Sequence, residues 1–184
     1  FFIFCGFVIL MTAFSGSLRH FVLSRLVRLY PAFWICCTIT FVAILTIGSP
    51  DYVATFSQYL VNMSMLSDFM DVESIDNAYW SLFVELKFYA LVAIVLLLGK
   101  VQQIETLFIF WLVVTIALII YPVFHLNFVL LDDYSAHFIA GATFFFIWSR
   151  GMTRIRCLVI VAAWLCVLYQ STVDMYEIEI RIRN

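Results

Sequence analysis

The sequence predicts an all-α protein, a polytopic transmembrane helical bundle of about six spans. Its composition is the first reason: the 184 residues are 65% hydrophobic and only 12% charged, with a mean hydropathy of +1.07. Soluble globular domains are about 45–50% apolar and about 25% charged. The length of the apolar segments and the distribution of charge between them are the other two reasons. We therefore expect a single membrane domain over residues 1–184.

Six apolar segments account for the predicted spans. They cover residues 1–15, 32–48, 77–98, 106–121, 134–149 and 157–172. A helix needs about 20 residues to cross a hydrocarbon layer about 30 Å thick. Phe1 already lies inside an apolar run, so we expect the first span to be partial and the chain to lack its natural beginning.

The region between the second and third apolar segments is more polar than a span. Residues 52–66 carry Gln58 and Asn62, so we expect an interfacial or re-entrant helix there. Residues 67–76 contain acidic side chains without a basic one, which is typical of a solvated loop. Counting 52–66 as a span would move the later basic loops to the side opposite the first one, so six spans is the better interpretation.

Charge alternates between the loops on the two sides of the predicted bundle. Seven of the ten Lys and Arg residues lie in the loops 16–31, 99–105 and 150–156. The opposite loops, 49–77 and 122–133, contain seven acidic residues and no Lys or Arg. Because basic loops stay in the cytoplasm, this pattern predicts that the first three loops are cytoplasmic. A net charge of −2 without a larger basic patch argues against a nucleic-acid partner.

The segment 77–98 carries the strongest functional signal, because Glu85 and Lys87 lie inside a predicted span. Each ionisable group there costs roughly 2.5–3.5 kcal/mol on insertion scales. The two side chains are about 200° apart around the helix axis, so they do not pair within it. Glu85 therefore needs a partner from another helix, from water or from a ligand, and the sequence offers no partner for Lys87.

Three polar side chains of this segment share one helix face. Ser81, Glu85 and Tyr89 are spaced by four residues, and Trp80 lies at the expected outer interface. One interpretation is a buried packing pair with interfacial aromatics. The other is a polar wall that lines a cavity, with Glu85 orienting a catalytic group or binding substrate hydroxyls.

Arg25 and Arg28 form the second group with chemical potential. They are three residues apart on one face, with Arg19 and His20 nearby. Guanidinium groups grip phosphates in a bidentate manner, so this group could hold a phosphate-rich ligand at the cytoplasmic mouth. Alone, the cluster is equally consistent with ordinary anchoring to lipid headgroups.

Histidines and cysteines indicate no metal centre. The three histidines, His20, His125 and His137, are not placed at the centre of a span, where a general base is expected, and we expect His125 and His137 to be solvated loop residues. The five cysteines lie in apolar runs without zinc-type spacing, which is typical of structural thiols: Cys5, Cys36, Cys37, Cys157 and Cys166.

Taken together, these elements resemble the multi-span acyltransferase family 3, membrane enzymes that O-acylate surface and exported sugars. The resemblance covers most of residues 1–150. Its most specific element is the pattern Trp-Ser-x-x-x-Glu-x-x-Phe-Tyr, which begins at Trp80. The supporting stretches are residues 2–7, residues 21–34 with Arg-x-x-Arg, and Phe138-Ile-Ala-Gly-Ala142. Where the family often has Ser before the Gly of its second span, this chain has Cys5.

The resemblance implies that an acyl group, commonly acetyl, moves from acyl-coenzyme A to a carbohydrate or polysaccharide hydroxyl. Arg25 and Arg28 would bind the phosphates of acetyl-CoA, which is a donor substrate and no resident cofactor. Glu85 and Ser81 would be the catalytic pair. Trp80 and Tyr89 would contact the substrate. The resemblance also implies a bacterial cytoplasmic membrane.

The family's core begins with a span that carries an arginine and a histidine, the histidine being the general base. That span is absent from this chain, so we expect the fragment by itself to be inactive. Two alternatives remain open at this point. In a transporter or flippase-like protein, Glu85 and Lys87 would belong to a proton or substrate pathway and the arginines would only set the topology. The third possibility is a non-catalytic remnant.

Overall fold

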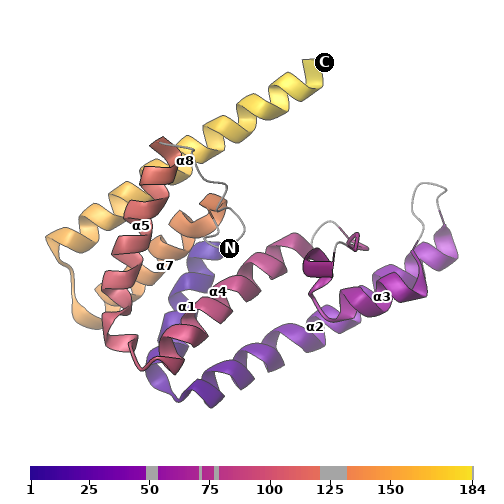
Figure 1. Ribbon diagram of the computed structural model, residues 1–184, viewed down its shortest axis with the longest axis horizontal. Coiled ribbons are helices and arrows are strands. Elements are labelled where there is room, and N and C mark those ends of the chain that lie inside the picture. Colours follow the sequence, from indigo (N-terminus) through magenta and orange to yellow (C-terminus); the bar gives the residue numbers. More distant parts are fainter. Residues whose placement is uncertain (49–53, 71, 77–78, 121–131, 184) are drawn as a thin grey trace. The chain divides into compact units, whose positions relative to one another are not determined.

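A computed structural model of the chain describes residues 1–48, 54–70, 72–76, 79–120 and 132–183. All regular elements among these residues are helical, as Figure 1 shows. The chain divides into two compact units. Unit 1 comprises Phe1–Ser17 and Ile94–Asn184, and unit 2 comprises Leu18–Ala93. The expectation of one membrane domain stays a prediction, and each unit is described separately below.

Unit 2 contains the longest segment whose structure differs from the sequence-based prediction. Its elements are α2 (Leu18–Ile47), α3 (Phe56–Met63), the 3₁₀ turn η1 (Ser67–Met70) and most of α4 (Trp80–Leu97). The predicted loop 16–31 is wrong, because only residues 16 and 17 separate α2 from the preceding helix. Residues 18–30 contain no Gly, Pro or Asn to stop a helix, and Pro31 removes a single backbone hydrogen bond inside α2.

The core of unit 2 lies between α2 and the segment that follows it. Its buried residues are Phe33, Cys37, Phe41, Met65 and Ile75. The predicted helix within 52–66 is confirmed as α3, which begins at a capping box formed by Thr55 and Gln58. Its interfacial or re-entrant placement stays a prediction.

The Asn62 side chain joins the segment after α3 to that helix by hydrogen bonds. Its amide nitrogen donates to the carbonyl oxygens of Gln58 at 2.9 Å and Glu73 at 3.3 Å, and its amide oxygen accepts from the Ile75 backbone N–H at 3.3 Å. This buried side chain therefore satisfies one carbonyl group within α3 and two backbone groups of residues 73–75, which lie outside regular helices.

The described residues of unit 1 form four helices and one short turn, besides the last residues of α4. These are α1 (Phe2–Ser15), η3 (Val101–Gln103), α5 (Ile104–Ile120), α7 (Asp132–Arg150) and α8 (Arg154–Arg183). Three of its predicted boundaries are wrong. The loop 150–156 is only Gly151–Thr153, and α8 continues beyond 172 because no Gly or Pro follows to end it. The loop 99–105 likewise contains η3 and the first residues of α5.

Helices α1 and α7 approach each other through glycines. A Cβ at Gly6 would lie 2.5 Å from the Phe138 carbonyl oxygen, and a Cβ at Gly141 would overlap the carbonyl oxygen of Ile3. Such contacts between small residues are typical of helix packing in membranes. They explain why Gly141 stands in the middle of a buried helix face.

Among the described residues, four helices are long and apolar enough to cross a bilayer, which indicates an integral membrane protein. They are Leu18–Ile47, Trp80–Leu97, Val101–Ile120 and Arg154–Val173. Helix α1 is a shorter apolar helix, and α7, which contains the predicted span 134–149, is not among the four. The membrane character is confirmed, whereas the count of six spans is not.

Candidate functional site

Helix α4 presents a buried carboxylate together with a tyrosine one turn later. Glu85 and Tyr89 are each only 6% exposed. The Tyr89 hydroxyl donates a short hydrogen bond to Oε1 of Glu85. The predicted common face of these two residues is thereby confirmed, and Ser81 lies half-buried one turn before Glu85 on the same helix.

Arg25 of α2 reaches the same tyrosine from the neighbouring helix. It is 6% exposed, and its guanidinium carbon lies 5.7 Å from the ring centroid of Tyr89 and 5.9 Å from that of Phe21. The guanidinium is also a hydrogen-bonding and charged neighbour of the Tyr89 hydroxyl. Arg25, Tyr89 and Glu85 therefore form one buried group between α2 and α4, named here the Arg25–Tyr89–Glu85 cluster.

The cluster contains a cation and a carboxylate that share one hydroxyl. Each charge would be costly in a membrane helix without compensation. The shared phenol and the aromatic faces of Phe21 and Tyr89 offset part of that cost, because a cation over an aromatic ring gains about 0.5–2 kcal/mol. Such a group can hold a proton donor or acceptor in a fixed orientation.

The sequence did not place Arg25 beside Glu85. The sequence-based prediction has Arg25 in a loop at the cytoplasmic mouth and Glu85 in the outer part of a span, which would keep the two side chains apart. They meet because α2 starts at Leu18, so that Arg25 projects from the body of a helix. The absence of a helix-breaking residue in 18–30 was the signal that could have revealed this arrangement.

The two arginines of the Arg-x-x-Arg element differ in environment. Arg25 is buried, whereas Arg28 is exposed. Arg28 and His20 line an open depression on α2 with a volume of about 410 Å³, together with Leu23, Ser24 and Val27. One cation, one imidazole and a hydroxyl beside apolar side chains are suited to a ligand with both a phosphate and an apolar part.

Lys87 finds a contact that the sequence did not predict. Its ammonium nitrogen lies 4.3 Å from the ring centroid of Phe83, four residues earlier on α4. This is a cation–π contact within one helix, at the same i,i+4 spacing that joins Glu85 and Tyr89. Trp80, the first residue of α4, is 45% exposed, which suits the predicted interfacial position.

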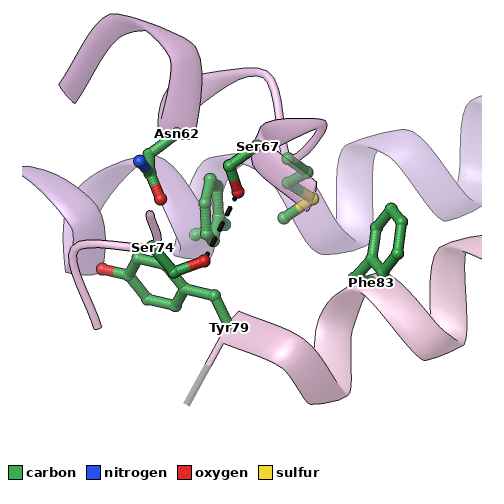
Figure 2. A pocket seen from close by; sticks show the side chains of 7 residues that line it. Asn62, Ser67, Ser74, Tyr79 and Phe83 are labelled. Carbon is green, nitrogen blue, oxygen red and sulfur yellow. Dashed lines mark hydrogen bonds between the residues drawn. The ribbon is translucent and has the colours of Figure 1, made fainter. Parts of the chain in front are cut away.

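A small enclosed cavity lies near the start of α4 in unit 2, and Figure 2 shows the side chains around it. Its volume is about 10 Å³, which is room for no more than one water molecule. Ser67 and Ser74 face each other across it with their hydroxyl oxygens 3.4 Å apart (Figure 2). The cavity is therefore too small to be a substrate pocket.

The remaining histidines do not assemble a site of their own. His137 lies half-buried in α7, so its prediction as a solvated loop residue is wrong. Its ring lies edge-on to Phe2 and tilted against Tyr134, with centroids 6.3 and 6.2 Å away. His125 lies outside the described residues. Within the described ranges, no group of three or more His, Cys, Asp or Glu side chains could hold a metal ion.

No protein-family model, curated protein or solved structure matches this chain. The resemblance to acyltransferase family 3 therefore rests on the motifs quoted above.

Proposed function

We propose that this protein is a membrane-bound acyltransferase that moves an acyl group, most simply acetyl, from acyl-coenzyme A to a carbohydrate hydroxyl. The observation that carries the proposal is the Arg25–Tyr89–Glu85 cluster, a buried ionisable group in two apolar helices. Ionisable groups at such positions are expensive and generally functional. The Trp-Ser-x-x-x-Glu element around the same Glu85 points to acyl transfer in particular.

In this proposal Glu85 orients the general base of the reaction. The carbohydrate hydroxyl attacks the thioester carbonyl, its proton passes to that general base, and coenzyme A leaves as the thiol. Tyr89 fixes the Glu85 carboxylate through its hydrogen bond, and Ser81 extends the polar face toward the acceptor. Trp80 supplies an exposed aromatic surface at the start of the helix, suited to a sugar ring.

The donor site in this proposal is the depression lined by Arg28 and His20. Arg28 binds a phosphate of the coenzyme, because it is the exposed member of the arginine pair. Arg25 acts as a positioning residue for Tyr89, since its guanidinium is buried against that ring. The family resemblance implies phosphate binding by both arginines, whereas here only Arg28 binds the phosphate.

We also propose the six-span arrangement. Arg150 at the end of α7 hydrogen-bonds Gln102 just before α5, so α7 returns to the level at which α5 starts. Nineteen helical residues extend about 28 Å, enough to cross the hydrocarbon layer. Helix α1 packs along α7 and is the remaining span. The distribution of basic residues supports a cytoplasmic location for residues 16–17, 99–103 and 151–153.

Binding of acetyl-CoA to the detergent-solubilised protein tests the donor site. Replacing Arg28 by Ala should weaken binding about tenfold or more, because a charge-assisted hydrogen bond is worth roughly 1.5–3 kcal/mol. Arg154→Ala is the control, since Arg154 is also an exposed arginine but lies on another helix. Unchanged affinity of Arg28→Ala, or equal losses in both variants, would exclude Arg28 as a phosphate ligand.

Acyl transfer to a polysaccharide acceptor in membranes that carry the protein tests Glu85. Glu85→Gln should lower turnover about a hundredfold or more while acetyl-CoA affinity stays constant. Glu73→Gln removes an exposed carboxylate and is the control. Normal turnover of Glu85→Gln would remove Glu85 from the mechanism. Absence of acetyl-CoA binding in the parent protein would favour the transporter or flippase-like alternative, in which the same buried charges serve a proton pathway.

A further inference from the structure

Unit 1 contains a second cluster of charges, separate from the proposed catalytic group. Glu105 near the start of α5 accepts two hydrogen bonds from Arg156 of α8, at 2.7 and 3.0 Å, and one from Arg150 of α7 at 3.4 Å. Arg156 also donates to the carbonyl oxygen of Gly151 at 2.5 Å. One carboxylate thus ties together the ends of three helices.

Arg150 is held in a fixed orientation at this point. Its guanidinium carbon lies 5.4 Å from the ring centroid of Phe14 and 5.3 Å from that of Phe146, and it donates to Gln102 at 3.2 Å. The side chain nevertheless remains 36% exposed. A guanidinium that is already oriented loses less conformational entropy when it binds an anion.

Positive charge exceeds negative charge here. Arg154 opens α8 and is exposed, and Lys100, also exposed, precedes Gln102 by two residues. Glu105 pairs with both Arg156 and Arg150, so a single negative charge faces the positive charges of Arg150, Arg154, Arg156 and Lys100. The name basic junction is used below for Lys100, Glu105, Arg150, Arg154 and Arg156.

Large apolar side chains adjoin the basic junction and face outward. Trp148 is 69% exposed, Met152 73%, Ile155 61% and Leu158 67%. Candidate membrane spans begin at Val101 and Arg154, so the junction lies where hydrocarbon gives way to the polar boundary. An anionic phospholipid presents the matching pattern, a phosphate at that boundary and acyl chains below it.

We infer that the basic junction binds the headgroup phosphate of an anionic phospholipid, whose acyl chains lie against the exposed apolar residues of α7 and α8. Arg150 and Arg154 supply the phosphate contacts. Arg156 and Glu105 hold the helix ends in place beneath them. This lipid site does not depend on the proposed acyltransferase activity.

Native mass spectrometry of the solubilised protein with added phosphatidylglycerol or phosphatidylcholine of identical chains tests the inference. The parent protein should retain phosphatidylglycerol preferentially. Arg154→Ala should reduce that retention about tenfold, and Arg150→Ala at least as much. Arg19→Ala is the matched control, because Arg19 is also an exposed arginine in the first turn of a helix, but lies in unit 2.

Three results would overturn the lipid site. The first is equal retention of the two lipids by the parent protein. The second is a loss in Arg19→Ala as large as in Arg154→Ala, which would indicate unspecific charge attraction. The third is displacement of phosphatidylglycerol by glycerol phosphate at matched concentration, which would indicate a site for soluble anions. Arg154 is exposed, so its variant keeps the packed core intact.

Discussion

The Tyr89 hydroxyl is the group that makes a buried carboxylate tolerable on α4. Glu85 is 6% exposed, and this hydroxyl is its hydrogen-bond donor on the same helix. Tyr89 also offers its ring to Arg25, so one side chain serves both charges. The i,i+4 spacing made the Glu85–Tyr89 contact predictable from the sequence. The contact with Arg25 was not predictable in this way, because Arg25 lies about 60 positions away from Glu85 in the chain.

Tyr89→Phe should destabilise the protein by about 1–3 kcal/mol, because it leaves a buried acceptor without its donor. Thermal unfolding in detergent, followed by circular dichroism, measures the effect. Tyr169→Phe is the control, since Tyr169 is 53% exposed on α8 and its hydroxyl can be solvated or reach headgroups. An equal midpoint for Tyr89→Phe and the parent would contradict the role assigned to this hydrogen bond.

At the scale of helices, the contact between α1 and α7 is the most constrained one in unit 1. Gly6 and Gly141 each let the backbone of the partner helix come within van der Waals distance. Aromatic pairs continue the contact toward the C-terminal ends, where Phe14 lies 5.4 Å from Phe145 and 5.9 Å from Phe146. The sequence did not identify α7 as the partner of α1.

Gly141→Ala should destabilise unit 1, because the new methyl group would overlap the carbonyl oxygen of Ile3 and push α1 away from α7. The sign of the change in stability is informative, because replacing Gly by Ala in an uncrowded helix interior stabilises the helix by about 0.5–1 kcal/mol. Urea or heat unfolding of the solubilised protein measures the change in the free energy of unfolding.

Gly99→Ala serves as the comparison for that experiment. Nothing lies within 4 Å of a Cβ at Gly99, and its φ of +67° adds only local backbone strain. A stabilising Gly141→Ala variant would show that α1 and α7 do not pack as described. A loss in Gly141→Ala no larger than in Gly99→Ala would contradict the close contact as well.

At the scale of the whole chain, the question is how many helices cross the bilayer. In the part of the chain that the structure describes, hydropathy and helix length support four spans directly. The hydrogen bond from Arg150 to Gln102 and the ion pair from Arg156 to Glu105 bring the α7–α8 turn to the start of α5. If α5 crosses the bilayer, α7 must cross it in the opposite direction to return there.

Single cysteines in a background without the five native ones should report this topology. Cysteines at Gln103 and Met152 should react with a membrane-impermeant maleimide from the same side, and a cysteine at Glu73 from the other. All three positions are exposed. The positive-inside rule assigns the first two to the cytoplasm. Labelling of Met152→Cys from the side of Glu73→Cys would instead show that α7 does not cross the bilayer, and would exclude the six-span arrangement.

Composition and periodicity determined that this chain is helical, that it belongs in a membrane and that Glu85 and Tyr89 share a face. Those properties depend on residue types and on spacings within one helix, which a sequence states directly. The tertiary structure alone decided that Arg25 joins Glu85 through Tyr89, that Arg28 does not, and that Glu105 gathers two arginines. These contacts join residues from different helices, and they depend on where α2 begins and how α5, α7 and α8 pack, which no local pattern specifies.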